Sequence, residues 1–285
     1  MIKLENIVLP SPQQWMAIIR GARNPLNSWD RMDSYITKIE DAQTMETADY
    51  AFFMGDSDHD LLMRLAKAGK DHRKFMRMIP VFMDIVAPRF WFLEFDTYKI
   101  ATVSNSCSTM HTIHKKEFTR DDFSCENMSI ESVEILDRVI DKLNIYRDAF
   151  VNGHEEIDET TGEHISIAPG DKFCWRQMID LLPQSYNQRR TITLNYEVLS
   201  NMYHARKNHK LQEWRTFCEW VESLPYSELI TCGGKPEVLY ICDGEACGPE
   251  CPNTDCMYTS DIKHAMHFHS DGEFYLEDYA LNSND

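Results

Sequence analysis

The fold of this chain is decided by the stretch from Leu194 to Trp214, which has the sequence LNYEVLSNMYHARKNHKLQEW. Its apolar residues recur mostly at three- and four-residue spacings, as on a helix that buries one face; they are Leu194, Val198, Leu199, Met202, Tyr203 and Ala205. Among the polar residues, Arg206 carries a permanent, planar charge that suits a phosphate, a carboxylate or the edge of a heterocycle. The same pattern is also typical of a plain core helix with a solvated polar face, so periodicity alone leaves both interpretations open.

A fixed spacing, N-x5-N-x4-R-x5-Q, relates four polar residues of this stretch: Asn195, Asn201, Arg206 and Gln212. A leucine-proline step, Leu181 to Pro183, precedes them. This arrangement resembles the C-terminal helix signature of the flavin-dependent thymidylate synthases (ThyX). The resemblance implies that Asn195 and Asn201 contact FAD. It also implies that Arg206 is the catalytic residue, which holds the pyrimidine of deoxyuridylate and favours loss of its ring N3 proton.

A second motif covers Thr97 to His111, TYKIATVSNSCSTMH. Members of the same family carry an Arg-His-Arg triplet there, followed by Asn-x-x-Ser. This chain keeps Asn105-x2-Ser108, but the triplet is degenerate; depending on a one-residue gap, it becomes Thr97-Tyr98-Lys99 or Tyr98-Lys99-Ile100. By resemblance, Asn105 and Ser108 would bind the nucleotide, and Lys99 would keep one positive charge toward flavin and nucleotide.

The loss of the triplet changes the chemistry that this region can offer, because a lysine cannot reproduce the fork of a guanidinium. A run of hydroxyls could instead donate hydrogen bonds to a phosphate; it comprises Thr102, Ser104, Ser106, Ser108 and Thr109. Such a run is equally typical of a turn that caps the next helix. Cys107 lies in the same loop, and we interpret it as an inert thiol because the sequence predicts no base beside it.

Composition restricts the class of protein. The chain has 285 residues, 43% of them apolar and 26% charged, with a net charge of -17. So negative a surface repels nucleic-acid phosphates, which argues against general nucleic-acid binding. The N-terminus lacks a basic region followed by an apolar run, and no stretch of about 18 apolar residues occurs. We therefore expect a soluble cytoplasmic protein that does not bind membranes.

Local patterns predict a mixture of strands and helices. Residues 1–9 resemble an edge strand, and a buried strand is expected up to Val86. Helices are expected over Ser11–Arg20, Met32–Glu40, Asp58–Ala68, Arg89–Phe95, Ser129–Phe150 and Trp175–Leu182, with a polar surface loop over His154–Gly170. The family resemblance, over about residues 70 to 230, implies an α/β (α+β) fold with a central sheet flanked by helices. It also implies a homo-oligomer, usually a tetramer, with active sites between subunits.

Two groups of polar residues are weaker candidates for binding. The loop could hold a metal ion through His154, Glu155, Glu156 and His164. Three nearby arginines could meet a nucleotide phosphate: Arg176, Arg189 and Arg190.

The C-terminal part of the chain has a different character. Four cysteines with the spacing C-x4-C-x3-C-x4-C predict one tetrahedral zinc; they are Cys242, Cys247, Cys251 and Cys256. His264 could replace one of them, and free cysteines or a redox pair are the alternatives. We therefore predict a thymidylate synthase-like domain over 1–232 and a small cysteine-rich segment over 233–285.

Three hypotheses about function remain. By resemblance, the chain is a divergent flavin-dependent thymidylate synthase-like enzyme, a FAD-dependent methyltransferase. It would reductively methylate deoxyuridylate (dUMP), or a related pyrimidine nucleotide, with methylenetetrahydrofolate and NADPH. The second hypothesis is a protein that keeps the nucleotide or flavin pocket without methyl transfer, and the degenerate triplet favours it. The third is an interaction module that works through its cysteine-rich segment.

Overall fold

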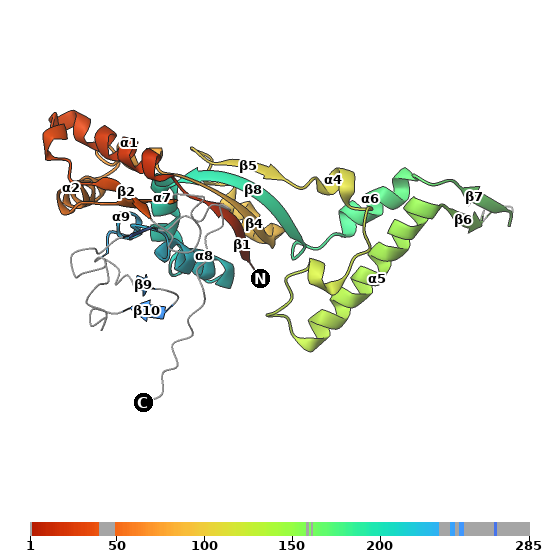
Figure 1. Ribbon diagram of the computed structural model, residues 1–285. Helices are drawn as coiled ribbons and strands as arrows, with labels where there is room; N and C mark the ends of the chain where they lie inside the picture. Colours follow the sequence, from red (N-terminus) through yellow and green to blue (C-terminus); the bar gives the residue numbers. More distant parts are fainter. Residues whose placement is uncertain are drawn as a thin grey trace.

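A computed structural model describes residues 2–39, 49–157, 160 and 162–233, together with three short strands farther along the chain. Its central sheet has four antiparallel strands in the order β1-β4-β8-β5. These strands are β1 (Lys3–Val8), β4 (Pro80–Pro88), β8 (Asn187–Asn195) and β5 (Val103–Ser106). Helices lie beside this sheet (Figure 1). The predicted α/β class with a central sheet flanked by helices is confirmed, and β1 is an edge strand as predicted.

The register of β4 and β8 fixes the position of the helix that follows β4. The two strands pair along their whole length, from Pro80 opposite Asn195 to Pro88 opposite Asn187. Helix α3 (Arg89–Phe95) begins at the residue after Pro88, where a proline ring ends the strand and presets the turn into the helix. The first residues of α3 therefore lie beside the start of β8.

The remaining elements are smaller sheets and helices outside the central sheet. A three-stranded sheet has the order β11-β3-β2, and two hairpins pair β9 with β10 and β6 with β7. Their bounds are β2 (Tyr35–Ile39), β3 (Asp49–Phe53), β6 (His154–Ile157), β7 (His164–Ile167), β9 (Tyr240–Cys242), β10 (Glu245–Cys247) and β11 (Ala265–Met266). The other α-helices are α1 (Pro12–Arg23), α2 (Asp56–Lys67), α4 (Thr109–Thr112), α5 (Ile130–Asn152), α6 (Lys172–Leu181), α7 (Tyr196–Arg206), α8 (Gln212–Glu222) and α9 (Glu228–Thr231).

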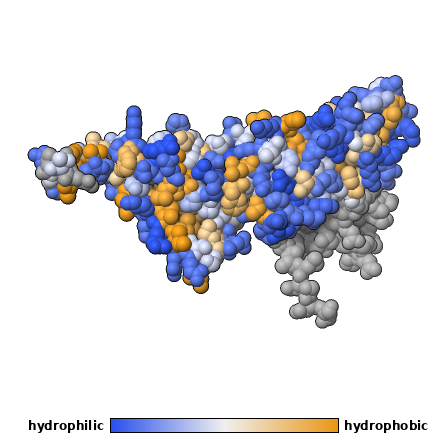
Figure 2. All heavy atoms as spheres, turned by 180° about the vertical axis from the view of Figure 1, so that it is seen from behind, coloured by the Kyte–Doolittle hydropathy of each residue, from blue (hydrophilic) through white to orange (hydrophobic). Residues whose placement is uncertain are grey.

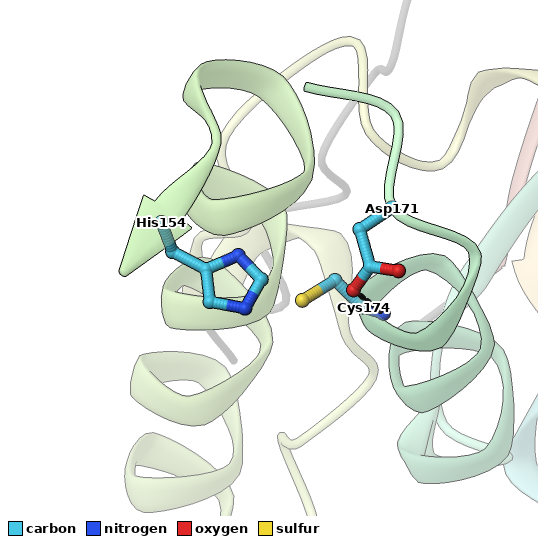
Figure 3. Close-up of side chains that lie close together, drawn as sticks. All are labelled: His154, Asp171 and Cys174. Carbon is cyan, nitrogen blue, oxygen red and sulfur yellow. Dashed lines mark hydrogen bonds between the residues drawn. The ribbon is translucent and has the colours of Figure 1, made fainter. Parts of the chain in front are cut away.

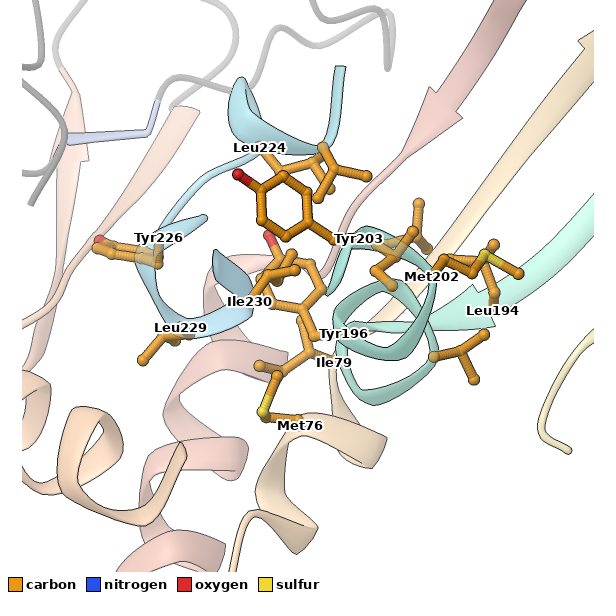
Figure 4. Packing of buried hydrophobic residues seen from close by; sticks show 14 of the residues in the cluster. Met76, Ile79, Leu194, Tyr196, Met202, Tyr203, Leu224, Tyr226, Leu229 and Ile230 are labelled. Atoms are coloured by element: carbon orange, nitrogen blue, oxygen red, sulfur yellow. The ribbon is translucent and has the colours of Figure 1, made fainter. Parts of the chain in front are cut away.

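Helix α7 lies inside the main hydrophobic core rather than on its surface. Tyr196 and Met202 are fully buried, among side chains from the segment before β4, from α9 and from the segment before α9 (Figure 4). Polar groups on the same helix are also buried and find partners: the Tyr196 hydroxyl donates to the carbonyl of Pro225 at 2.6 Å, and Ser200 Oγ donates to the carbonyl of Ile230 at 3.0 Å. Because α7 is enclosed on most sides, its sequence lacks the strong two-faced pattern of a surface helix.

Helices α5 and α6 form an arm, defined here as residues 109–186, that extends away from the central sheet and carries the β6–β7 hairpin at its far end (Figure 1). The arm has its own small core, which includes Leu143 and Met178, both fully buried. Its surface carries apolar side chains (Figure 2). On α5 the exposed apolar residues are Ile130, Ile135, Ile145 and Val151.

Several local predictions are confirmed. Helix α1 begins at Pro12 after the Ser11 cap, whose side chain accepts from the Gln14 amide in a capping box. Helix α3 begins at Arg89 as expected, and α5 and α6 match their predicted helices to within a few residues. No helix among the described residues is both long enough and apolar enough to cross a membrane.

Other local predictions are wrong. The expected helix over Met32–Glu40 is instead strand β2, whose β-branched and aromatic residues pair with β3. The stretch Leu194–Trp214 is not one helix, because Leu194 ends β8 and a turn separates α7 from α8. The expected loop over His154–Gly170 contains the β6–β7 hairpin. The helix expected from Asp58 begins two residues earlier, at Asp56 after Gly55, and the Asp58 side chain is buried.

Candidate functional site

A pocket of about 350 Å³ opens between α3, the segment that follows β5, the start of β8 and α6. Charged and polar residues line one part of it: Arg89, Ser106, Cys107, Ser108, Thr109, Gln188 and Arg190. Apolar side chains line the rest: Leu93, Met110, Ile179 and Leu182. We call this the Arg89–Arg190 pocket.

The sheet register holds the hydroxyl-bearing segment against β8. Ser106 pairs with Arg190, and the Cys107 amide donates to the carbonyl of Arg189 at 3.0 Å. Gln188 Nε2 then donates to the carbonyl of Cys107 at 3.0 Å and to Thr109 Oγ1 at 3.3 Å. These bonds fix segment 106–109 beside the two arginines.

The two arginines of the pocket differ in their surroundings. Arg190 Nη1 donates to Asp96 Oδ1 at 2.7 Å, its Nε donates to Gln188 Oε1 at 3.1 Å, and its guanidinium lies 3.9 Å from the centre of the Phe92 ring. Arg89 is half-buried, and its guanidinium forms no hydrogen bond or ion pair with any residue that the structure describes. Because a guanidinium stays charged at any working pH, Arg89 offers a positive charge that no carboxylate among the described residues neutralises.

Arg206 lies in a different group of side chains, built around Glu94 of α3. Its Nη1 is 2.7 Å from Glu94 Oε2, and its Nε donates to the Tyr98 hydroxyl at 3.0 Å. The same carboxylate oxygen accepts from Trp214 Nε1 at 2.9 Å and lies 3.4 Å from His209 Nε2. The guanidinium also lies 4.9 Å from the centre of the Trp214 ring, a cation–π contact. In this arrangement Arg206 is held inside the chain by a carboxylate and an aromatic ring.

The asparagines assigned to flavin by resemblance also have partners within the chain. Asn195 is the N-cap of α7, and its Oδ1 accepts from the Val198 amide at 3.1 Å. Asn201 Oδ1 accepts from Arg73 Nη2 at 3.3 Å. Arg73 in turn forms a partly buried ion pair with Glu197, 2.7 Å between Nε and Oε2.

The predicted site residues therefore fall into separate groups. Of this set, Ser108 lines the Arg89–Arg190 pocket, where its Oγ also caps the short helix α4. Asn105 is exposed on β5 opposite Thr191, and Lys99 is exposed in the turn before β5. These two residues do not line that pocket, nor do Asn195, Asn201 and Arg206, and their roles stay predictions.

Sequence reasoning proposed Arg190 as one of three phosphate candidates but missed Arg89 and Gln188. The available signal was the position of Arg89 directly after the strand-ending Pro88, at the start of a helix. Gln188 had no such signal, because its role depends on the register between β5 and β8.

The predicted metal ligands can be placed only in part. Cys242 and Cys247 lie on the paired strands β9 and β10, opposite Glu245 and Tyr240. Cys251, Cys256 and His264 lie outside the described residues.

The candidate set in the arm divides into two separate pairs rather than one site. His154 Nε2 lies 3.1 Å from Glu156 Oε1, and His164 Nδ1 lies 3.6 Å from Glu155 Oε2.

The fold and the pocket define a mixed α/β protein with an antiparallel central sheet and a pocket lined by two arginines. Comparison with known structures finds thymidylate synthase X (ThyX) from Helicobacter pylori with FAD and dUMP, at 13% identity and a TM-score of 0.49, covering 80% of this chain and 96% of that one. A second structure of the same flavin-dependent thymidylate synthase, complexed with FAD and dUMP, matches at 12% identity and a TM-score of 0.46, covering 78% and 95% of the two chains. No protein-family model matches the chain, and no curated protein matches it.

Proposed function

We propose that this protein binds a pyrimidine nucleotide, dUMP or a close relative, with the phosphate in the Arg89–Arg190 pocket. The observation that carries the proposal is the arrangement of that pocket. Arg89, which has no internal ion pair among the described residues, and Arg190 share it with the hydroxyls of Ser106, Ser108 and Thr109. Guanidinium groups bind phosphate oxygens through paired, charge-assisted hydrogen bonds, and hydroxyls can donate to the remaining oxygens.

The apolar part of the pocket suits the rest of such a ligand. Leu93 and Met110 line the same pocket as the arginines. Small-molecule sites typically combine an apolar wall with a few polar groups that fix the orientation of the ligand. The net charge of -17 makes the chain as a whole repel anions, so phosphate binding at this pocket would rest on its local arginines.

The first candidate activity is that of a divergent flavin-dependent thymidylate synthase-like enzyme. It would reductively methylate the nucleotide with FAD, methylenetetrahydrofolate and NADPH. The N-x5-N-x4-R spacing from Asn195 to Arg206 and the Asn105-x2-Ser108 element support this activity by resemblance. A cytoplasmic location and a homo-oligomer, in the family usually a tetramer, belong to the same proposal. The exposed apolar residues of α5 favour an oligomer, since a second chain would cover them.

The described residues do not form a flavin cradle in the present arrangement. The side-chain oxygens of Asn195 and Asn201 accept hydrogen bonds from within the chain. Lys99 supplies a single charge in place of the family's triplet, and its side chain is exposed. FAD therefore enters the proposal through the resemblance alone.

The second candidate activity is nucleotide binding without methyl transfer. The specific observation in its favour is that Arg206, the predicted catalytic residue, is paired with Glu94 and covered by Trp214. A guanidinium whose charge is already balanced offers less to a pyrimidine ring than one that is free.

Zinc in the cysteine-rich segment is a separate proposal, which concerns stability rather than catalysis. Four thiolates around one zinc leave no open position for a substrate. Cys242, Cys247, Cys251 and Cys256 would hold the ion, and the segment over 233–285 would form a unit apart from the domain over 1–232. In that case the ion would supply the stability that so short a segment lacks in apolar core.

One set of measurements on the purified full-length protein separates these activities. The absorbance spectrum is recorded from about 300 to 550 nm with FAD, then with FAD and dUMP, and dUMP binding is measured by calorimetry. Formation of dTMP is then followed with methylenetetrahydrofolate and NADPH present. A flavin band perturbed by dUMP, together with dTMP formation, establishes the first candidate. Binding of dUMP with no flavin binding and no dTMP establishes the second. Absence of dUMP binding refutes both.

A further inference from the structure

Three potential metal ligands from different parts of the arm lie close together. A ring nitrogen of His154, the Sγ of Cys174 and a carboxylate oxygen of Asp171 are all within 4.8 Å of one another. Figure 3 shows the His154 ring and the Asp171 carboxylate on opposite sides of the Cys174 sulfur. This group differs from the set expected in the sequence, since it shares only His154 with it.

Separate elements bring these residues together. His154 is the first residue of β6, directly after the Gly153 that ends α5 with a φ of 79°. Asp171 caps α6 and accepts from the amides of Phe173 and Cys174 at 3.1 and 3.2 Å. Because α5 and α6 pack against each other in the arm core, the end of one helix faces the start of the other.

The two ring nitrogens of His154 differ in their hydrogen-bond partners. Its Nε2 lies 3.1 Å from Glu156 Oε1, whereas its Nδ1 is buried and has no hydrogen-bond partner among the described residues. Histidines that bind metals usually pair one nitrogen with a carboxylate, which orients the ring and leaves the other nitrogen for the ion.

We propose that His154, Asp171 and Cys174 bind one zinc ion. Imidazole, thiolate and carboxylate are all zinc ligands, and a thiolate disfavours magnesium and calcium. Zinc bonds of about 2.0 to 2.3 Å place tetrahedral ligands roughly 3.5 Å apart, so the three donor atoms need to approach one another by only about 1 Å. A water molecule completes the coordination. The ion links the β6–β7 hairpin to the start of α6 and closes the far end of the arm.

A cysteine-histidine-aspartate group could also suggest a nucleophile, but the surroundings of the thiol argue against it. Cys174 is 3% exposed. Burial, and then the neighbouring Asp171 carboxylate, raise the pKa of the thiol to about 11. Reactive cysteines instead have a lowered pKa and solvent access.

The test compares zinc bound by full-length variants after chelator treatment and titration with zinc chloride, with metal content measured by mass spectrometry. The parent protein is expected to bind one equivalent more than Cys174→Ala. The matched control is Cys218→Ala, which removes an equally buried thiol from α8 and should bind as much zinc as the parent. Cys242→Ser with Cys247→Ser should leave the equivalent at Cys174 in place, so the two proposed sites are counted separately.

A second variant keeps the test decisive if Cys174→Ala fails to fold. Asp171→Asn preserves the helix cap, because asparagine caps as well as aspartate, but it is a poorer zinc ligand. We expect the affinity of this site for zinc to fall at least about 10-fold, the lower end of what is lost when only an outer partner is removed. Equal zinc content in the parent and Cys174→Ala, or unchanged affinity in Asp171→Asn, overturns the proposal.

Discussion

Replacing Arg89 with alanine should weaken dUMP binding strongly while leaving the fold intact. The guanidinium is half-buried in the pocket wall and has no partner among the described residues, so its removal breaks no internal hydrogen bond or ion pair. Unfolding free energy should stay within about 0.5 kcal/mol of the parent, as for other substitutions that remove no specific interaction. The same change removes the charge that we assign to the phosphate.

The expected loss follows from the energy of charge-assisted hydrogen bonds. Hydrogen bonds to charged groups contribute about 1.5 to 3 kcal/mol, which corresponds to a roughly 10- to 150-fold increase in Kd. Calorimetry with dUMP at fixed salt measures this change, and urea unfolding checks the fold. Arg190 is a poorer test because its guanidinium also pairs with Asp96 and stacks on Phe92, so its loss would disturb the pocket wall.

The control for Arg89→Ala is Arg176→Ala. Arg176 is exposed on α6, pairs only with Asp180 among the described residues, and does not line the pocket. The Arg176→Ala substitution removes the same charge from the chain and should leave the Kd for dUMP unchanged. A Kd for Arg89→Ala within twofold of the parent would refute the assignment of the phosphate to this pocket.

Three further predictions concern stability and metal binding. Asn195→Ala removes the cap of α7 and should cost about 1 kcal/mol in urea unfolding, whereas Asn195→Asp should cost much less; equal losses would mean that capping is not its role. Burial raises the pKa of Asp58, but the hydrogen bonds that its carboxylate accepts outweigh this and hold the pKa below its ordinary 3.8. Its contribution is therefore present above pH 3.8 and is lost as the pH falls through the lower folded value. Asp58→Asn, which leaves Arg23 buried without a charged partner among the described residues, should cost about 3 to 5 kcal/mol at pH 7, and this difference from the parent should shrink toward pH 3. Cys242→Ser with Cys247→Ser should abolish zinc binding by the cysteine-rich segment, and metal analysis that shows the same zinc content as the parent would contradict that site.

The sequence predicts those elements whose signals are local. Ser11 with Pro12, and Pro88 before Arg89, each determine a helix start through their own backbone preferences, and both helices lie where expected. The helix predicted over Met32–Glu40 was wrong because a short run of residues forms a strand only when a partner is present, and the sequence does not show that β3 pairs with this run.

The prediction of a helix from Leu194 onward was wrong for a related reason. Its apolar residues recur mostly at helical spacings, but β8 pairs with β4 as far as Asn195, and the strand ladder overrides the local pattern at Leu194. Asn195 is both the last residue of β8 and the N-cap of α7. The candidate site depends on such long-range pairing even more, since Arg89, Ser106 and Arg190 meet only through the register of three strands. Sequence motifs could suggest the residue types of the pocket but not which of them share it.

Glu94 decides between the two candidate activities. If Arg206 contacts the pyrimidine in the bound state, the nucleotide must first break the ion pair between Arg206 and Glu94. Their side chains are 20% and 35% exposed, and pairs of this kind contribute about 0.2 to 1 kcal/mol. Breaking this ion pair therefore costs the ligand little binding free energy. If Arg206 contacts the pyrimidine, removing the pair should raise the affinity for dUMP.

Glu94→Gln removes the negative charge but keeps a side-chain oxygen that can accept from Trp214 Nε1, which now donates to Glu94 at 2.9 Å. If the enzyme hypothesis is right, the variant should bind dUMP up to about fivefold more tightly, because the ion pair no longer competes with the ligand. If the pocket binds the nucleotide without Arg206, the Kd should not change. Calorimetry on Glu94→Gln and on the Glu94→Gln, Arg206→Ala double variant separates these cases, because a gain that persists without Arg206 cannot come from freeing its guanidinium.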